Sequence, residues 1–239
     1  MLIVYTKTRI VYFVLTAKQF FYFNVPVLNN DDSFYNALPL RAILVIKLVN
    51  NYTRIMSNKI YITRHGESLW NVEGKVQGVT DTPLTQNGIN QAHELAKKIK
   101  NSALKIDEVL HSPLSRAAET AKIVAQENGL PLTLEPRLIE QNFGEYEGHE
   151  WAKHPGVFHE AKKQFANDYN GGESMLRLGQ RIYNLLDELK ARSKAENKTF
   201  LLVTHGGIAR MIHSYFYSET NEEFSSTETK NCEIREYTF

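Results

Sequence analysis

Short apolar runs alternate with longer amphipathic segments from residue 56 to the end of the sequence. The apolar runs predict strands at residues 59–63, 108–111, 132–135, 199–204 and 233–239. Between several of these runs, apolar residues recur every three or four positions, which is typical of a helix that buries one face. Strands that alternate with helices favour an α/β fold, in which helices flank a mostly parallel sheet.

Three helices follow from this spacing and from the residues at their ends. Thr85 suits the N-cap of the first helix, because its hydroxyl can accept a hydrogen bond from a free backbone N–H. Pro113 suits the first turn of the second, since proline lacks an N–H that would stay unbonded there, and Asn128-Gly129 marks its end. The third opens at Ser174 or Glu173. The apolar stripes that we expect to face the core are Ile89, Ala92, Ala96 and Ile99 in the first helix and Leu178, Ile182, Leu185 and Leu189 in the third.

Residues 1–55 follow neither pattern for long. They are rich in Tyr, Phe, Val and Asn, and their longest uncharged apolar stretch, residues 10–17, is too short to span a bilayer. Lys18 and Gln19 stand where the small residues of a signal-peptide cleavage site would be expected. Residues 1–55 could be a membrane anchor, a poorly ordered extension, or a stretch upstream of the true translation start. We favour the third interpretation, with Met56 as the start. We therefore expect an extension, residues 1–55, with poor order and little packing against the rest, and one catalytic domain, residues 56–239.

Composition narrows the classes of function. Hydrophobic residues make up 42% and charged residues 23% of the chain, as in ordinary soluble proteins. The net charge of +1 divides into +4 over residues 1–55 and −3 over the rest. A mildly acidic domain is a poor candidate for nucleic-acid binding, and we expect no membrane partner. Cys232 is the only cysteine, so no internal disulfide can form, and we expect a reducing, cytoplasmic compartment and no catalytic role for this thiol.

Basic side chains stand close to the ends of three predicted strands. Arg64-His65-Gly66 follows the first strand, Arg116 lies at the start of the helix after the second, and His205 follows the strand at residues 199–204. The carboxyl ends of parallel strands share one edge of a sheet, so we expect these groups to meet there. Arg64, Arg116 and His205 can supply positive charge around a phosphoryl group. We expect Gly66 to allow a sharp turn and to leave room for a substrate.

Three motifs together resemble the histidine phosphatase superfamily, which includes the cofactor-dependent phosphoglycerate mutases. The motifs are Arg64-His65-Gly66-Glu67-Ser68 with Trp70-Asn71, Ser112-Pro113-Leu114-Ser115-Arg116-Ala117 with Glu119-Thr120-Ala121, and Thr204-His205-Gly206-Gly207. The similarity runs over about residues 58–239. It implies a three-layer α/β sandwich around a mainly parallel central sheet, and a covalent phosphohistidine on His65 with no metal and no nucleotide cofactor.

The resemblance also implies roles for residues around His65. The phosphoryl group would be bound by Arg64, Asn71, Arg116 and His205, and Glu140 would be the proton donor. The remaining residues that we assign to substrate binding are Ser68, Gln77, Gly78 and Gly206.

Elementary chemistry accounts for the two central roles. A histidine accepts a phosphoryl group only as a neutral ring, so we expect the other nitrogen of His65 to donate to a backbone carbonyl. Glu140 lies in a glycine-containing loop and can protonate the departing alkoxide, then take a proton from water. Glu145 and Glu147, in the same loop, compete for this role. Glu67 and Glu173 stand where carboxylates cap helices, so we interpret both as mainly structural.

Two enzymatic readings remain, and we favour a phosphatase over a mutase. Phosphoglycerate mutases usually carry an arginine after the catalytic glutamate and a long basic insertion further on, whereas here Gln141 follows Glu140 and only 32 residues separate Glu140 from Glu173. A non-catalytic binding module is the third alternative. We expect a specificity lid at residues 146–170, with apolar walls and a second anion contact from Trp151, Phe158, Phe165 and Tyr169 with Lys153, Lys162 and Lys163. The ligand would be a small phosphorylated metabolite; the sequence leaves open its identity and whether the chain forms a homodimer.

Overall fold

The computed structural model describes residues 2–6, 9–16, 19–26, 59–150, 160 and 163–239. The chain divides into two compact units, Met1–Thr53 and Arg54–Phe239. Within the described residues, none of the helices is both long enough and apolar enough to cross a membrane.

The first unit contains a three-stranded antiparallel sheet, formed by β1 (Leu2–Thr6), β2 (Arg9–Thr16) and β3 (Gln19–Pro26). We expected no sustained strand pattern here. The segments are rich in β-branched and aromatic residues, which favour strands, but their apolar residues run on without strict alternation, so the period of two is hidden. Whether residues 1–55 belong to the native protein stays a prediction.

The second unit is built on a five-stranded sheet. Its strands are β4 (Lys59–Arg64), β5 (Glu108–His111), β6 (Leu132–Leu134), β7 (Phe200–Thr204) and β8 (Ile234–Thr238). The order is β6-β5-β7-β4-β8, and all neighbours are parallel except β8, which runs antiparallel to β4. Every strand predicted from the apolar runs is therefore present, with each end shifted by at most one residue.

Helices connect these strands. The longer ones are α3 (Gln86–Lys100), α4 (Ser115–Asn128), α6 (Met175–Glu196) and α7 (Gly206–Phe216), and the shorter ones are α2 (Leu69–Val72), α8 (Asn221–Ser226) and two 3₁₀ turns, η2 (Pro136–Leu138) and η3 (Gly144–Tyr146). Thr85 caps α3 by accepting a hydrogen bond from the Gly88 N–H, as predicted. Ser174 caps α6 in the same way, which decides between Ser174 and Glu173. Gly129, at φ 63°, ends α4.

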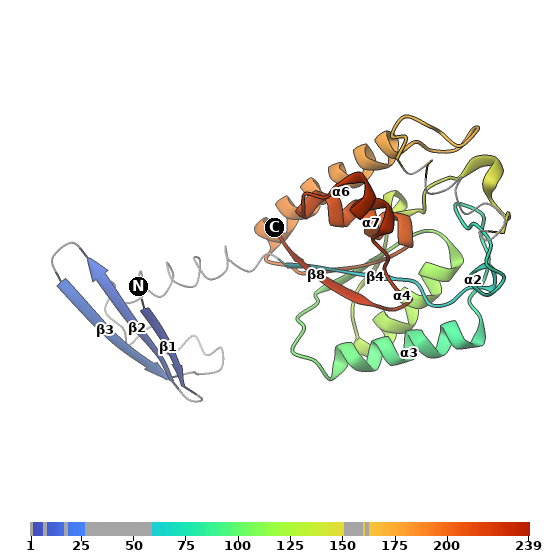
Figure 1. Cartoon of the computed structure of the whole chain (residues 1–239). Coiled ribbons are helices and arrows are strands. Elements are labelled where there is room, and N and C mark those ends of the chain that lie inside the picture. Colours follow the sequence, from blue (N-terminus) through green and yellow to red (C-terminus); the bar gives the residue numbers. More distant parts are fainter. Residues whose placement is uncertain (1, 7–8, 17–18, 27–58, 151–159, 161–162) are drawn as a thin grey trace. The chain divides into compact units, whose positions relative to one another are not determined.

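The helices form a layer on each face of the sheet (Figure 1). In β4, Ile60 and Ile62 face the layer of α6 and α7, whereas Tyr61 between them faces α3 and α4. Leu178, Ile182, Leu185 and Leu189 of α6 are fully buried, as their spacing predicts. The three-layer α/β sandwich is thereby confirmed.

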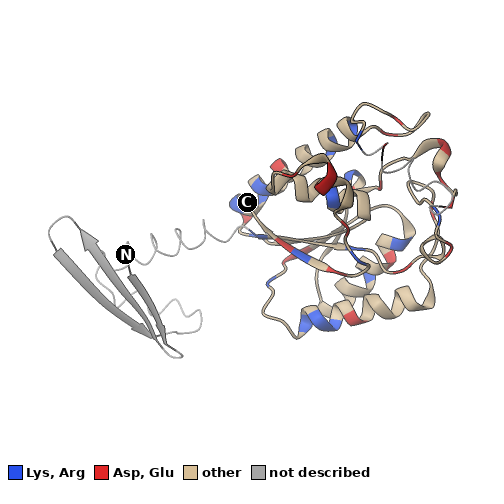
Figure 2. Ribbon diagram, viewed as in Figure 1, with Lys and Arg blue, Asp and Glu red and all other residues tan. Residues whose placement is uncertain are grey.

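Lys and Arg are interspersed with Asp and Glu over the face of this unit seen in Figure 2. Lys97, Lys98 and Lys100 gather in the last turn of α3, where positive charge interacts favourably with the helix dipole.

Candidate active site

The carboxyl ends of three adjacent parallel strands build the site. The backbone N–H of His65, just after β4, donates to the carbonyl of Thr204 at the end of β7 (2.9 Å). The N–H of Ser112, just after β5, donates to the carbonyl of Val203 (3.2 Å). Residues that are up to 141 positions apart in the sequence therefore start neighbouring loops, and α7 begins at the same edge.

The His65 ring is buried and held in one orientation. Its Nδ1 lies 2.6 Å from the Gly66 carbonyl oxygen, which can only accept, so Nδ1 carries the hydrogen and Nε2 keeps its lone pair. Burial lowers the pKa of His65 well below its usual value, and the Arg64 and Arg116 charges lower it further. The ring is neutral with a backbone-fixed tautomer, as the sequence predicts.

Gly66 is required by packing of the backbone. A Cβ at this position would lie 2.3 Å from the carbonyl oxygen of Gly88 in the first turn of α3. The N–H of Gly66 donates to Thr120 Oγ1 (3.1 Å), which itself donates to the Arg116 carbonyl (2.7 Å). Our expectation that this glycine leaves room for a substrate is therefore corrected: the close neighbour is the backbone of α3.

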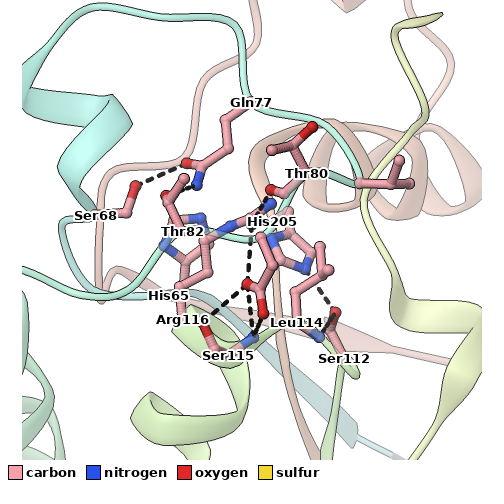
Figure 3. Close-up of polar contacts among 12 residues, drawn as sticks. His65, Ser68, Gln77, Thr80, Thr82, Ser112, Leu114, Ser115, Arg116 and His205 are labelled. Carbon is pink, nitrogen blue, oxygen red and sulfur yellow. Dashed lines mark hydrogen bonds and ion pairs between the residues drawn. The ribbon is translucent and has the colours of Figure 1, made fainter. Parts of the chain in front are cut away.

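His205 lies beside His65, with 5.1 Å between the ring centroids (Figure 3). Its Nε2 is 2.7 Å from Ser112 Oγ, and its buried Nδ1 has no hydrogen-bond partner among the described residues. Burial lowers the pKa of His205 well below its usual value, helped by the charge of Arg116. We counted His205 among the positive charges, whereas its burial and the neighbouring cations favour the neutral ring.

Two guanidinium groups supply the positive charge around these rings. Arg64 donates through one terminal nitrogen to the Thr229 carbonyl (3.2 Å), and Arg116 donates to the carbonyls of Gly78 (2.7 Å) and Thr80 (3.0 Å). The Nε of each arginine is buried and has no partner within the described part of the chain. Burial lowers the pKa of Arg116 to about 10, so both groups are charged at neutral pH.

Glu140 is the carboxylate that reaches this cluster. It is 5% exposed, and its two oxygens accept hydrogen bonds from the backbone N–H groups of Gln141 (2.8 Å) and Gly207 (2.9 Å). In its ionised form, Glu140 also opposes the lowering of the pKa of Arg64 and of Arg116 by burial.

Its two competitors are engaged elsewhere. Glu147 accepts hydrogen bonds from the N–H groups of Val79 (2.9 Å), Thr80 (2.7 Å) and Phe143 (3.1 Å), and so ties two loops together. Glu145 is exposed and accepts from the Asn170 side chain (3.1 Å). Neither residue lines the cavity beside His65, so the geometry favours Glu140 for acid and base chemistry.

A cavity of about 410 Å³ opens beside the His65 ring. The predicted site residues on its wall are Arg64, His65, Asn71, Gln77, Glu140 and Gly206. The cavity residues that we did not predict are Lys75, Phe143, Gly207, Arg210, Glu228 and Thr229. Two of them had a signal in the sequence. Gly207 belongs to the Thr204-His205-Gly206-Gly207 motif, and Arg210 interrupts the apolar run of residues 208–212.

Four predicted site residues are buried behind this wall: Ser68, Gly78, Arg116 and His205. Ser68 Oγ donates to Gln77 Oε1 (2.7 Å), and the Gln77 amide donates to Thr82, as Figure 3 shows. The Gly78 carbonyl holds Arg116, and a Cβ on Gly78 would lie 2.0 Å from Glu147 Oε1. The assignment of Ser68 and Gly78 as direct substrate contacts is thus corrected, because they hold Gln77 and Arg116.

Part of the expected lid lies outside the described residues, including Trp151, Lys153, Phe158 and Lys162. Tyr169 is 1% exposed and packs edge-on against Phe143, with 5.4 Å between the ring centroids. Lys163 lies 3.4 Å from carboxylate oxygens of both Glu160 and Glu222. Tyr169 is therefore core, and Lys163 is neutralised by acidic neighbours away from the cavity.

The residues interpreted as structural do have structural partners. Glu67 accepts a hydrogen bond from the Thr85 hydroxyl (2.7 Å), and Glu173 forms a two-pronged ion pair with Arg181 (2.7 Å for each prong). Burial raises the pKa of Cys232 to about 12, so this thiol stays protonated and is a poor nucleophile.

Residues 60–239 match the family model of the histidine phosphatase superfamily, branch 1. The chain belongs to the histidine phosphatase superfamily. A relative in this superfamily, the probable phosphoglycerate mutase GpmB of Yersinia pestis, is 40% identical over 156 residues, which cover 62% of this chain and 69% of that protein.

Solved structures in the same superfamily share the fold. The phosphoserine phosphatase of Entamoeba histolytica, in complex with 3-phosphoglyceric acid, is 30% identical with a TM-score of 0.65, over 76% of this chain and 90% of that one. A putative alpha-ribazole-5′-P phosphatase of Escherichia coli is 26% identical with a TM-score of 0.60, over 74% of this chain and 88% of that one. The proteins similar to this chain therefore include two named as phosphatases and one named as a probable mutase.

Proposed function

We propose that this protein is a metal-independent phosphomonoesterase that hydrolyses a small phosphorylated metabolite through a phosphohistidine on His65. The observation that carries the proposal is the state of that ring: neutral, with Nδ1–H bound to the Gly66 carbonyl and the Nε2 lone pair free, beside two guanidinium groups. This is the arrangement that a nitrogen nucleophile for phosphorus requires.

In the first step, the Nε2 lone pair of His65 forms the P–N bond while the bond from phosphorus to the ester oxygen breaks. Protonated Glu140 gives its proton to the departing alkoxide, which leaves as the alcohol. The ring keeps its Nδ1 proton, and the Gly66 carbonyl stabilises the positive charge that the ring gains.

In the second step, water attacks phosphorus and Glu140 takes a proton from that water. The P–N bond breaks, its electron pair returns to Nε2, and inorganic phosphate leaves. Glu140 is then protonated again, as it was before the first step, so the cycle closes without another reactant.

The other site residues hold the transferring group. Arg64 and Arg116 neutralise its charge through donors that the protein leaves unused, and the orphaned Nδ1 of His205 offers another polar contact. Asn71 and Gln77 contribute side-chain amides from the wall of the cavity. Gly206 begins α7, whose first backbone N–H groups and dipole favour an anion.

Phosphate release from p-nitrophenyl phosphate in the presence of EDTA tests this proposal on the full chain. We expect turnover that EDTA does not reduce, and a phosphorylated protein that acid dephosphorylates and alkali does not. His65→Ala should lose essentially all turnover, whereas Glu140→Gln should keep a measurable residue, since a positioned acid contributes about 10²–10⁴-fold. Equal and mild losses in the two variants would contradict the assignment.

A mutase is the second candidate, favoured by the 40% identity to the Yersinia pestis relative. It would appear as conversion of 3- to 2-phosphoglycerate that 2,3-bisphosphoglycerate stimulates. Against it stands Gln141, whose amide donates to the Glu173 carbonyl (2.9 Å) at the position where mutases usually carry an arginine. Binding of phosphate esters without either activity would indicate a binding module.

A further inference from the structure

Arg210 is a buried cation on the cavity wall that the proposed mechanism does not use. It lies on α7, just over one turn after His205, among the apolar residues Ile208, Met211 and Ile212. The residue is only 8% exposed, yet it is one of those that line the cavity. Burying a guanidinium group is unfavourable unless its donors find acceptors.

The described residues provide few hydrogen-bond acceptors for the donors of Arg210. Within the described residues, its one hydrogen bond runs from Nε to the Thr227 carbonyl (3.1 Å), and no acidic side chain there forms an ion pair with it. The ring of Phe224 lies 5.9 Å away. A guanidinium group has five N–H donors, so four are left for a ligand in the cavity. By contrast, Lys75 on the same wall already has a partner, because it pairs with Glu73 at 2.6 Å.

Arg210 lies further from the His65 ring than Arg64 and Arg116 do. Its charge is not among those that act on this ring, although Arg210 and Arg64 share two acidic neighbours, Glu140 and Glu228. The pKa values of the two imidazoles are lowered by the charges of Arg64 and Arg116, which places those cations around the phosphoryl group. The charges that act most strongly on Arg210 are Glu140 and then Glu228, an exposed residue that lines the cavity.

This position has a consequence for the substrate, if Glu140 has its proposed role. Glu140 protonates the ester oxygen, so the alcohol part of the substrate must leave past this carboxyl group. On α7, Arg210 comes one turn after Gly207, whose N–H holds Glu140, and it does not act on the His65 ring as Arg64 does. Arg210 therefore lies beside the alcohol part rather than beside the phosphoryl group.

We propose that Arg210 binds a second anionic group on the alcohol part of the substrate, either a carboxylate or a second phosphate. The preferred substrates would then be phosphomonoesters with two anionic groups a few bonds apart, and simple alkyl phosphates would be poor ones. The planar fork of arginine suits both anions, because each can accept two parallel hydrogen bonds. This inference rests on the proposed phosphatase function.

Matched pairs of substrates test it on the full chain, with kcat/KM measured as phosphate release. 3-Phosphoglycerate and glycerol 3-phosphate differ only in a carboxylate against a hydroxymethyl group, and phosphoserine and phosphoethanolamine only in a carboxylate against hydrogen. Fructose 1,6-bisphosphate against fructose 6-phosphate tests a second phosphate instead. In at least one pair, we expect the wild type to prefer the doubly anionic member by about 10- to 100-fold, the size of effect of a hydrogen-bonded charge.

Variants then assign the preference to Arg210. Arg210→Met should reduce it to less than about 3-fold, and Arg210→Lys should leave an intermediate value, because lysine keeps the charge and loses the fork. Arg177→Met is the matched control: this arginine is exposed on α6 and does not line the cavity, so the preference should persist.

The outcomes separate the two proposals. Absence of turnover on every substrate, or turnover that survives in His65→Ala, would remove the proposed function itself. Turnover that depends on His65, with both members of all three pairs hydrolysed equally well by the wild type, would overturn the role of Arg210 alone. The wild-type comparison tests the role of Arg210 even if Arg210→Met fails to fold. An unchanged preference for the doubly anionic substrate in folded Arg210→Lys and Arg210→Met proteins would also overturn this role.

Discussion

Replacing Gly207 by alanine should displace Glu140 without unfolding the protein. A Cβ at position 207 would lie 2.6 Å from Glu140 Oε1 and 3.2 Å from its Cδ, whereas ordinary contact begins at 3.4 Å. The carboxylate must therefore move by about 0.8 Å, away from position 207, which weakens its hydrogen bond from the Gly207 N–H. The neighbour that moves is the end of a side chain, so the backbone can stay in place.

The expected loss of activity follows from this displacement. A misplacement of about 1 Å in a reacting group can cost about 10²-fold, so kcat/KM should fall about 10²-fold, or roughly 2.7 kcal/mol of transition-state stabilisation. Stability should change little, because alanine favours a helix by up to about 1 kcal/mol over glycine, which offsets part of the lost hydrogen bond.

The choice of substrate sharpens the assay. An alkyl phosphate needs a proton on its leaving oxygen, whereas p-nitrophenolate leaves readily without one, so the loss should be larger for glycerol 3-phosphate than for p-nitrophenyl phosphate. Combining Gly207→Ala with Glu140→Gln should add little to either single change, because both act through one carboxyl group.

Gly179→Ala is the matched control. Gly179 is also a helical glycine, on α6, but its Cβ would lie 3.5 Å from Met211 Sδ, which is an ordinary contact. This variant should gain up to about 1 kcal/mol in stability and keep its kcat/KM. Wild-type turnover of an alkyl phosphate by folded Gly207→Ala protein would refute the placement of Glu140 as the acid.

Three further predictions concern stability and pH. Gly66→Ala should lower the free energy of unfolding by roughly 1–3 kcal/mol, measured in urea, because its methyl group meets a backbone carbonyl of α3 at 2.3 Å that cannot swing away. Glu147→Gln should lower the free energy of unfolding by about 1–3 kcal/mol and should also lower kcat/KM, because an amide nitrogen cannot accept hydrogen bonds from the backbone N–H groups that the carboxylate binds. The control variant Glu145→Gln should stay within about 0.5 kcal/mol of the wild type. The pKa of His65 is lower in the folded protein than in the unfolded chain. Below about pH 6.5, the unfolded chain therefore binds a proton that the folded protein does not bind. As the pH decreases further, the free energy of unfolding decreases by up to about 1.4 kcal/mol per pH unit. His65→Ala should show a shallower fall between pH 7.5 and 5.5, and an identical slope would contradict the buried neutral ring.

Much of the fold can be predicted from the sequence because it depends on neighbours along the chain. The hydroxyl of Thr85 caps α3 by binding the N–H of Gly88, which is only three residues further along the chain. The buried apolar stripe of α6 follows from apolar residues spaced three and four positions apart. The shared edge of the parallel strands then explains why His65 and His205 meet. The strands of residues 2–26 were missed because their apolar runs lack strict alternation.

The sequence by itself determined the family, the order of strands and helices, and the set of polar groups near the sheet edge. Only the tertiary structure decided which carboxyl group lines the cavity with His65, since Glu140 and Glu147 share one loop and differ in the backbone N–H groups that they bind. It also decided the neutral state of His205 and the exposure of Arg210 to the cavity. The charge state of a side chain and its access to the cavity depend on burial and on neighbours that come from several loops. The spacing of residues along one segment does not determine either of them.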